Sequence, residues 1–460
     1  MTDSHKADPH TKKGNSLKQP VIALLLSSFA ALNFTALSFA APAHKPLAHH
    51  HAHAAVATHH VAAHGTSGRL ATAKATPAHT AHSAHVVSAR AAKAAPAEAS
   101  AHLATTSRHG HGARAVLAVR RTRMSTAHGE RFTASSFSDI DNLTLGDVTD
   151  GEDPIVRAAA IQALGNMNGT ALAIDPTTGR ILAMVNQKLA LSPGAEPCST
   201  IKLSVALAAL EEGIVDRNTP VNLGGGYHVD MTYALAKSVN PYFEVLGRTL
   251  GFERVKHYAN QFGLGELAGY NIQGEQLGTY PDHELPQAQG GVGRMCSFGE
   301  SVQVTPLQLG ALVSAIANGG TLYYLQHPQT PQEIATFEPK VKRILNIAPI
   351  IPEILPGMAG AVNASFGTAR SLRTNFHEFP VMGKTGTCSN NGTRYGWFGS
   401  FADTPTGRIV TVIFLEGGRP TFGPKAAELT GQLYRGLADR GYFQPKSVVP
   451  SAQITSTGTR

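Results

Sequence analysis

The chain has 460 residues, 42% of them hydrophobic, and a formal net charge of +8. This length allows two or three domains of ordinary size. The positive charge is confined to the first part of the chain, because residues 1–131 hold 15 Lys and Arg against 4 Asp and Glu, whereas residues 132–460 hold 24 against 27. A nucleic-acid-binding protein carries its basic stripe on the folded part, so we exclude this class and expect no nucleic-acid partner.

A short polar leader and an apolar segment are the first predicted elements. Residues 1–20 include Lys12, Lys13 and Lys18, and residues 21–40 read "VIALLLSSFAALNFTALSFA". Such a segment can span a bilayer with its N-terminus in the cytoplasm. It also resembles a long signal peptide, since small residues at positions 38–43 suit a cleavage site. We favour an uncleaved anchor, which predicts a single-pass inner (plasma) membrane protein whose remaining residues lie on the periplasmic or extracytoplasmic side.

Residues 41–131 are rich in histidine and alanine. Of the 22 histidines in the chain, 17 lie at or before His128, in runs such as "LAHHHAHAAVATHH". Large apolar residues are too few here to offset the conformational entropy that folding would cost. We therefore predict a disordered linker, and a disordered tail at 446–460. Histidine clusters can bind metal, but no spacing here resembles a formed site, and we favour a solvated spacer over a metal store. We expect no metal or cofactor, and one folded unit at 132–445.

The folded unit is predicted to begin with a β-hairpin and a buried helix. Residues 169–186, "GTALAIDPTTGRILAMVN", contain two apolar runs around a turn composition, which indicates a hairpin. From Ser199 to Gly213, "STIKLSVALAALEEG", apolar residues fall on every side of a helix, which is typical of a helix in the centre of a domain. Ser199 and Lys202 share a face at its N-terminal end.

A buried lysine beside a serine suggests nucleophilic catalysis. Burial disfavours the charged form of Lys202 and turns its ammonium into a proton acceptor. A neutral amine one turn from the Ser199 hydroxyl can activate that hydroxyl as a nucleophile, and the helix N-terminus favours a developing oxyanion. The pair alone is weak evidence, because a serine at a helix start with a snorkelling lysine nearby is ordinary.

Two further motifs strengthen this interpretation. At residues 238–240, "SVN", a hydroxyl and an amide alternate just before a proline, where we expect a loop-to-helix turn. At residues 384–387, "KTGT", a cation and two hydroxyls alternate along a predicted strand. A period of two places Lys384 and Gly386 on one face of that strand and Thr385 and Thr387 on the other, and the glycine would let a substrate backbone lie close.

In this order, the three segments resemble the S-x-x-K, S-x-N and K-T-G motifs of the penicillin-recognising serine enzymes. "STIK" at 199–202 is the only S-x-x-K in the chain, and 384–386 is its only K-T-G, whereas S-x-N recurs at 389–391. The stretches "ALAIDPTTGRILAMVN", "VQVTPLQLGALVSAIANGGTLY" and "AVNASFGTAR" also resemble the transpeptidase domain of penicillin-binding proteins. The resemblance covers residues 169–437. It implies an α/β (α+β) fold with a central antiparallel sheet, flanking helices and an all-helical lobe.

The resemblance also implies the catalytic residues of a peptidoglycan D,D-transpeptidase. Ser199 would be acylated by the carbonyl between two D-alanines of a stem peptide, with Lys202 as its base. Ser238 would relay a proton to the leaving amine, supported electrostatically by Lys384. An amine of a neighbouring stem would then release the acyl group as a cross-link. β-Lactams would mimic the first step and stall, and proteins of cell-wall synthesis are candidate partners.

Substrate binding is implied in the same way. Asn240 would bind the amide of the stem peptide, while Thr385 and Thr387 would hold its terminal carboxylate beside Gly386. The backbone N–H groups of Ser199 and Thr387 would form the oxyanion hole, which is worth roughly 3 kcal/mol per donor in other enzymes.

Alternatives stay open at this point. A β-lactamase would need a deacylation base, for which Glu266 is only a loose approximation. A D,D-carboxypeptidase would use water in place of the acceptor amine, and an inactive sensor or binding module would keep the pocket alone. For the three cysteines we favour small buried residues over a regulatory disulfide. The family fold nevertheless brings Cys198 and Cys388 to adjacent walls of the cleft, where a disulfide would distort the oxyanion hole.

Overall fold

The computed structural model describes residues 132–444. The leader (1–20), the apolar segment (21–40), the linker (41–131) and the tail (446–460) expected from the sequence all lie outside the described residues. Within the described range, no helix has both the length and the apolar character needed to cross a membrane.

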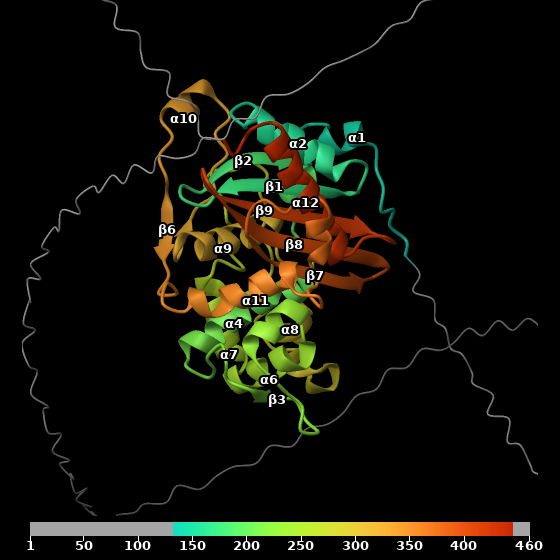
Figure 1. The fold of residues 1–460 in the computed structure, drawn as a ribbon, viewed down its shortest axis with the longest axis vertical. Helices are drawn as coiled ribbons and strands as arrows, with labels where there is room; N and C mark the ends of the chain where they lie inside the picture. The colour runs from blue at the N-terminus through green and yellow to red at the C-terminus, as the bar shows by residue number, and fades with distance from the viewer. Residues whose placement is uncertain (1–131, 445–460) are drawn as a thin grey trace, which may run out of the picture. The chain divides into compact units, whose positions relative to one another are not determined.

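The sheet lobe is built on five strands in the order β2-β1-β9-β8-β7, and every neighbouring pair is antiparallel (Figure 1). The first two strands form the hairpin that the sequence predicts, so that prediction is confirmed. Two pairs of short strands lie outside this sheet. The strands are β1 (Gly169–Asp175), β2 (Arg180–Val185), β3 (Val221–Asn222), β4 (His228–Val229), β5 (Thr321–Tyr323), β6 (Val341–Ile344), β7 (Val381–Asn390), β8 (Thr393–Thr404) and β9 (Gly407–Gly417).

Twelve α-helices and three 3₁₀ turns accompany the strands in the described part of the chain. The α-helices are α1 (Ile140–Thr144), α2 (Pro154–Leu164), α3 (Gln187–Ala190), α4 (Lys202–Glu211), α5 (Met231–Lys237), α6 (Asn240–Leu250), α7 (Phe252–Gln261), α8 (Gly291–Phe298), α9 (Pro306–Asn318), α10 (Pro331–Ala335), α11 (Ile351–Asn363) and α12 (Gly423–Asp439). The 3₁₀ turns are η1 (Cys198–Ile201), η2 (Gln287–Gln289) and η3 (Arg370–Thr374).

Both faces of the sheet are covered, because side chains alternate along each strand. On β1, Leu172 and Ile174 pack into the core shared with α4 and α9, whereas Ala171 and Ala173 pack into a second core with α2 and α12. Two-sided burial explains why β1 and β9 read as nearly continuous apolar runs. The fold class expected from the sequence is therefore confirmed.

The helical lobe surrounds α4, which lies against α6, α7 and α11 (Figure 1). All residues of α4 from Lys202 to Leu210 are buried, as the all-round apolar pattern predicts. Helix α11 contacts both α5 and β7 and so joins this lobe to the edge of the sheet. The head of α4 consequently lies where the two lobes meet.

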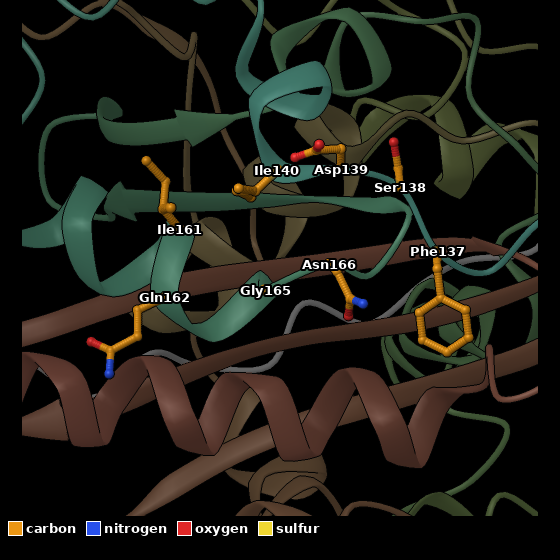
Figure 2. A pocket seen from close by; sticks show the side chains of 8 residues that line it. All are labelled: Phe137, Ser138, Asp139, Ile140, Ile161, Gln162, Gly165 and Asn166. Carbon is orange, nitrogen blue, oxygen red and sulfur yellow. The ribbon is translucent and has the colours of Figure 1, made fainter.

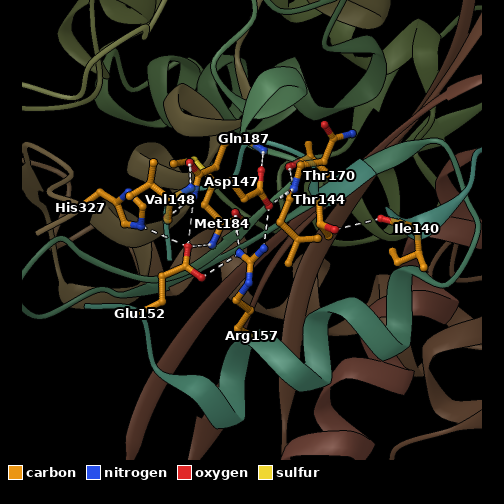
Figure 3. A network of polar contacts seen from close by, with 12 residues as sticks. Ile140, Thr144, Asp147, Val148, Glu152, Arg157, Thr170, Met184, Gln187 and His327 are labelled. Carbon is orange, nitrogen blue, oxygen red and sulfur yellow. Dashed lines mark hydrogen bonds and ion pairs between the residues drawn. The ribbon is translucent and has the colours of Figure 1, made fainter. Parts of the chain in front are cut away.

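A buried polar network fixes the start of the described chain to the sheet (Figure 3). The Arg157 guanidinium donates to Asp147 at 2.8 Å and to Glu152 at 2.9 Å. Glu152 also contacts the Nε2 of His327 at 3.1 Å, and Asp147 accepts the backbone N–H groups of residues 186–187. These charges are paired, which is the condition for burying them at tolerable cost.

Candidate active site

Ser199 lies in η1, immediately before α4. The sequence predicted a helix starting at Ser199, but the first turn is 3₁₀ and the α-helix begins at Lys202. A tighter turn is common at a helix N-terminus, and it begins with Cys198 in the left-handed region at φ 51°. Ser199 is half-buried and Lys202 is fully buried, so the hydroxyl is accessible from the cleft while the amine lies beneath it.

The amine of Lys202 is the centre of the site. Its Nζ donates to the Ser199 hydroxyl at 3.0 Å, the Ser238 hydroxyl at 3.0 Å, the Ser238 carbonyl at 2.9 Å and Oδ1 of Asn240 at 2.6 Å. An ammonium has three protons for these four oxygens. A neutral amine has a free lone pair instead, which can accept the proton of a hydroxyl at this distance.

Electrostatics favour a neutral Lys202. Burial lowers the pKa of Lys202 well below its ordinary value, and the positive charge of Lys384 lowers it further, although Glu244 opposes this. Burial alone lowers the pKa of Lys384 to about 7. Strongly shifted pKa values of this kind are typical of functional sites.

Ser238 caps the end of α5 and Asn240 is the first residue of α6, as the sequence predicts for a loop-to-helix turn. Ser238 ends α5 in the left-handed region at φ 60°, and Val239 donates its N–H to the Ala234 carbonyl at 2.9 Å. This closure is a common way to end a helix. This helix end turns the Ser238 hydroxyl toward both lysines. Lys384 Nζ donates to the same hydroxyl at 2.9 Å. Ser238 therefore bridges the two amines.

Residues 384–387 lie on β7, the strand that the sequence predicts. β7 is the edge strand of the sheet, and it lies against η1 and α11. Lys384 reaches Ser238 from the buried side, while Thr385 and Thr387 line the cavity. A Cβ on Gly386 would lie 2.7 Å from the Pro197 carbonyl oxygen, so this glycine lets η1 approach the strand. Its expected role beside a substrate backbone stays a prediction.

A cavity of about 440 Å³ joins these elements. It brings together Ser199, Ser238, Asn240, Thr385 and Thr387 from the predicted set, with Lys202 and Lys384 buried behind it. The roles of these residues are not tested by their positions and stay proposals.

Sequence reasoning missed six further residues of this cavity. Thr368 accepts a hydrogen bond from the Thr385 hydroxyl at 2.7 Å. The other five lining residues are Phe298, Gly367, Arg370, Ser371 and Pro424. The stretch "AVNASFGTAR" held the signal for Gly367, Thr368 and Arg370, whereas the other three had none.

Cys198 and Cys388 form a disulfide, with their Cα atoms 5.5 Å apart, and Cys296 is a buried free thiol. The preferred interpretation of the cysteines as space-filling residues is therefore wrong for this pair, because the nucleophile turn and β7 approach closely at Gly386. In this disulfide-bonded form the Ser199 hydroxyl remains 3.0 Å from Lys202 Nζ. The nucleophile and the amine are thus in contact with the bond present.

Glu266 does not line the cavity. Its carboxylate is bound by Lys342 at 2.7 Å and by Arg343 at 2.8 Å, so it is occupied as a structural ion-pair partner. This observation counts against a β-lactamase that deacylates through Glu266. Within residues 132–444, no group of three or more His, Cys, Asp or Glu side chains is arranged to hold a metal ion.

A larger cavity, of about 620 Å³, lies between the segment before α1 and the end of α2 (Figure 2). Its side chains include Phe137, Ile140, Ile161 and Gln162, and its one carboxylate, Asp139, caps α1 by accepting the Asp141 N–H. Its lining residues include Ser138 but no lysine or histidine, and Asp139 is engaged as a helix cap, so size alone does not mark the active site here.

Comparison with known proteins agrees with this geometry. Residues 169–435, more than half of the chain, match the family model described as penicillin binding protein transpeptidase domain. Among solved structures, Pseudomonas aeruginosa PBP2 in complex with WCK 5153 is similar, with a TM-score of 0.53 at 22% sequence identity over 64% of this chain and 75% of that one. At this identity the likeness shows the fold alone.

Curated relatives are similar over part of their length. Stage V sporulation protein D of Bacillus subtilis is 29% identical over 47% of this chain and 39% of the relative. Peptidoglycan D,D-transpeptidase MrdA of Acinetobacter baumannii is 24% identical over 61% and 52%, and peptidoglycan D,D-transpeptidase FtsI of Escherichia coli is 25% identical over 61% and 53%. The matched region spans about half the length of these relatives, or less.

Proposed function

The chain belongs to the family of penicillin-binding protein transpeptidase domains, and on this premise we propose that it is a peptidoglycan D,D-transpeptidase that works through a serine acyl-enzyme and is inhibited by β-lactams. The observation that carries the proposal is the amine of Lys202, within 3.0 Å of the hydroxyls of both Ser199 and Ser238. One base in contact with two hydroxyls suits a reaction that takes a proton from a nucleophile and returns it to a leaving group.

The first half-reaction acylates the serine. Lys202 takes the Ser199 proton while Oγ attacks the carbonyl between the two D-alanines. The C–N bond of the tetrahedral intermediate then breaks, and the departing amine of the terminal D-alanine receives a proton through Ser238. Lys384 contacts the same Ser238 oxygen at 2.9 Å, so its charge can stabilise that relay. The product is an ester between Ser199 and the shortened stem.

The second half-reaction releases the ester to an acceptor. An amine from a neighbouring stem attacks the acyl carbon, loses a proton to the same base, and Ser199 recovers its hydroxyl proton as the ester opens. If water attacked instead, the protein would be a D,D-carboxypeptidase. The same residues serve both outcomes, so the acceptor decides between them.

Substrate contacts are proposed from the lining of the cavity. Thr385 and Thr387 would bind the terminal carboxylate, and the Asn240 amide would bind the peptide. The backbone N–H groups of Ser199 and Thr387 would form the oxyanion hole. The 3₁₀ turn helps, since the first N–H groups of such a turn have no partner within it. Gly386 would allow the close approach that these contacts need.

We also propose a location for this activity. The sequence of residues 21–40 suits a membrane anchor, which would place the active site on the extracytoplasmic side, where stem peptides are cross-linked. Stem peptides that end in D-Ala-D-Ala are the expected substrates, and proteins of cell-wall synthesis are the expected partners.

An intact-mass time course of the full-length protein with a penicillin tests the proposal. We expect a long-lived covalent adduct that maps to Ser199. The variant Ser199→Ala should form none, whereas Ser365→Ala, which changes an exposed serine, should behave like the wild-type protein.

Other outcomes would point elsewhere. A transient adduct with consumed drug would indicate a β-lactamase, and a folded protein with neither adduct nor turnover would favour an inactive binding module. With a stem-peptide donor and an added amine, ligated product indicates a transpeptidase and hydrolysis alone a carboxypeptidase.

A further inference from the structure

A second cavity, of about 360 Å³, continues from the catalytic one along β7. The two cavities share Phe298 and Thr387 as lining residues. The catalytic cavity extends from Thr387 toward Thr385, whereas the second extends from Thr387 toward Asn390. A ligand lying along the strand would therefore enter both.

The position of β7 in the sheet suits a ligand that is an extended peptide. It is the edge strand of the sheet, and an edge strand offers backbone groups to an added strand. In the proposed function the terminal carboxylate lies near Thr385 and the scissile carbonyl near Ser199 and Thr387. The upstream part of the donor must then run toward Asn390, antiparallel to β7. Three residues of strand span about 10 Å, enough for the residues that precede the two D-alanines.

The second cavity is charged. Its ionisable lining residues are Glu196, Arg294 and Glu300, which sum to one negative charge. Arg294 pairs with Glu300 at 2.8 Å and stacks over the ring of Phe298 at 4.1 Å, so these two charges satisfy each other. Glu196 has no ion-pair partner within 4.0 Å among the described residues and accepts a hydrogen bond from the Asn390 amide at 3.2 Å. The cavity thus presents a carboxylate with no cation in direct contact among the described residues, although the Ser301 N–H and the more distant charge of Arg294 lower its pKa in part.

The chemistry of cross-linking supplies that cation. Each stem must carry an amine, because the acceptor of one reaction is a copy of the donor of another. The two D-alanines occupy the C-terminal end, so the amine-bearing residue lies upstream of them. On the donor stem this amine does not react, and as an ammonium it needs a counter-charge.

We propose that the second cavity binds the amine-bearing side chain of the donor stem peptide, with the Glu196 carboxylate as the specificity-determining contact for its ammonium. The proposal rests on the proposed function and adds a subsite to it. Burial raises the pKa of Glu196, and this cost of a buried charge would be relieved by a bound cation. Cys388, which is disulfide-bonded to Cys198, also lines the second cavity and ties it to the nucleophile turn.

Matched donor peptides test the subsite on the full-length protein in detergent. We compare acetyl-lysyl-D-Ala-D-Ala, with a free side-chain amine, against the same peptide with that amine acetylated, and use glycine in excess as a common acceptor. The measured quantity is kcat/KM for release of the terminal D-alanine. We expect kcat/KM to be about tenfold higher for the free-amine donor. This effect lies between those of an exposed ion pair and a fully buried one. Glu196→Gln, which keeps the acceptor for Asn390, should abolish the preference.

The control variant is Glu253→Gln, which removes an exposed carboxylate on α7 and should keep the preference. Equal rates for the two donors in the wild-type protein, or an unchanged preference in Glu196→Gln, would overturn the subsite; the first comparison needs no variant. Penicillin lacks the upstream amine, so its adduct reports a folded active site in every sample. Absence of that adduct from the wild-type protein would overturn the proposed function and the subsite with it, whereas a normal adduct with equal donors would overturn the subsite alone.

Discussion

Reduction of the Cys198–Cys388 disulfide should destabilise the domain strongly. The bond joins residues 190 apart in the sequence, so it restricts a long loop of the unfolded chain. Loop-closure entropy gives about 5 kcal/mol for a loop of this length, and losses on removing a native disulfide are typically about 2–5 kcal/mol. Since whole domains unfold at about 5–15 kcal/mol, this one bond is a large share of the total.

Urea unfolding of the oxidised and reduced protein measures this effect. With a denaturant slope of roughly 3 kcal/mol per molar, a loss of about 2–5 kcal/mol lowers the urea midpoint by about 0.7–1.7 M on reduction. Cys198→Ala and Cys388→Ser should give the reduced midpoint without reductant, whereas Cys296→Ala should keep the dependence on reductant, because Cys296 is not bonded.

Two results would refute this reasoning. One is a midpoint that reduction leaves unchanged. The other is alkylation of all three cysteines in the unfolded, unreduced protein, since the structure leaves Cys296 alone with a free thiol.

Three further predictions follow from buried groups. The pKa of Lys384 falls from an ordinary value near 10.4 to about 7 on folding. Between pH 7 and pH 10 the unfolded chain therefore binds more protons than the folded one, and stability should rise with pH. Lys384→Met should flatten that rise in urea midpoints taken at several pH values. Arg157→Met should cost about 3–5 kcal/mol of unfolding free energy by leaving two buried carboxylates without their cation, whereas the exposed pair lost in Arg254→Ala should cost under about 1 kcal/mol; equal losses would contradict the burial argument. Gly386→Ala should slow penicillin acylation and lower stability by about 1–3 kcal/mol, because its Cβ would lie 2.7 Å from the Pro197 oxygen; wild-type rates from this variant would show that β7 does not need that approach.

Much of the site could be predicted from local sequence, because each of its three motifs lies in a short segment and the family resemblance implies the roles of their residues, while periodicity places the elements that carry them. The all-round apolar pattern after Ser199 located the central helix, and the apolar runs flanking a turn located the first hairpin. Alternation along β7 correctly separated Lys384 from Thr385. These are properties of a single element, and a single element is what sequence periodicity reports.

Contacts between distant elements could not be predicted in that way. The hydroxyl pair of Thr385 and Thr368, the pairing of Cys198 with Cys388, and the pairing of Glu266 with Arg343 each depend on how lobes pack. The preference for unbonded cysteines failed for this reason, since a distance between two segments is not encoded in either one. The 3₁₀ geometry of η1 was missed because helix patterns do not resolve the first turn.

The burial of α4 from Lys202 to Leu210 has a consequence for how this protein could change over generations. Lys202 begins this helix and Ser199 lies in the turn just before it, so a substitution that shifts either residue also disturbs the buried centre of the helical lobe. Substitutions that change ligand binding at lower cost to stability are therefore expected at the rim of the cavity, where Arg370 is exposed and Ser371 is half-buried.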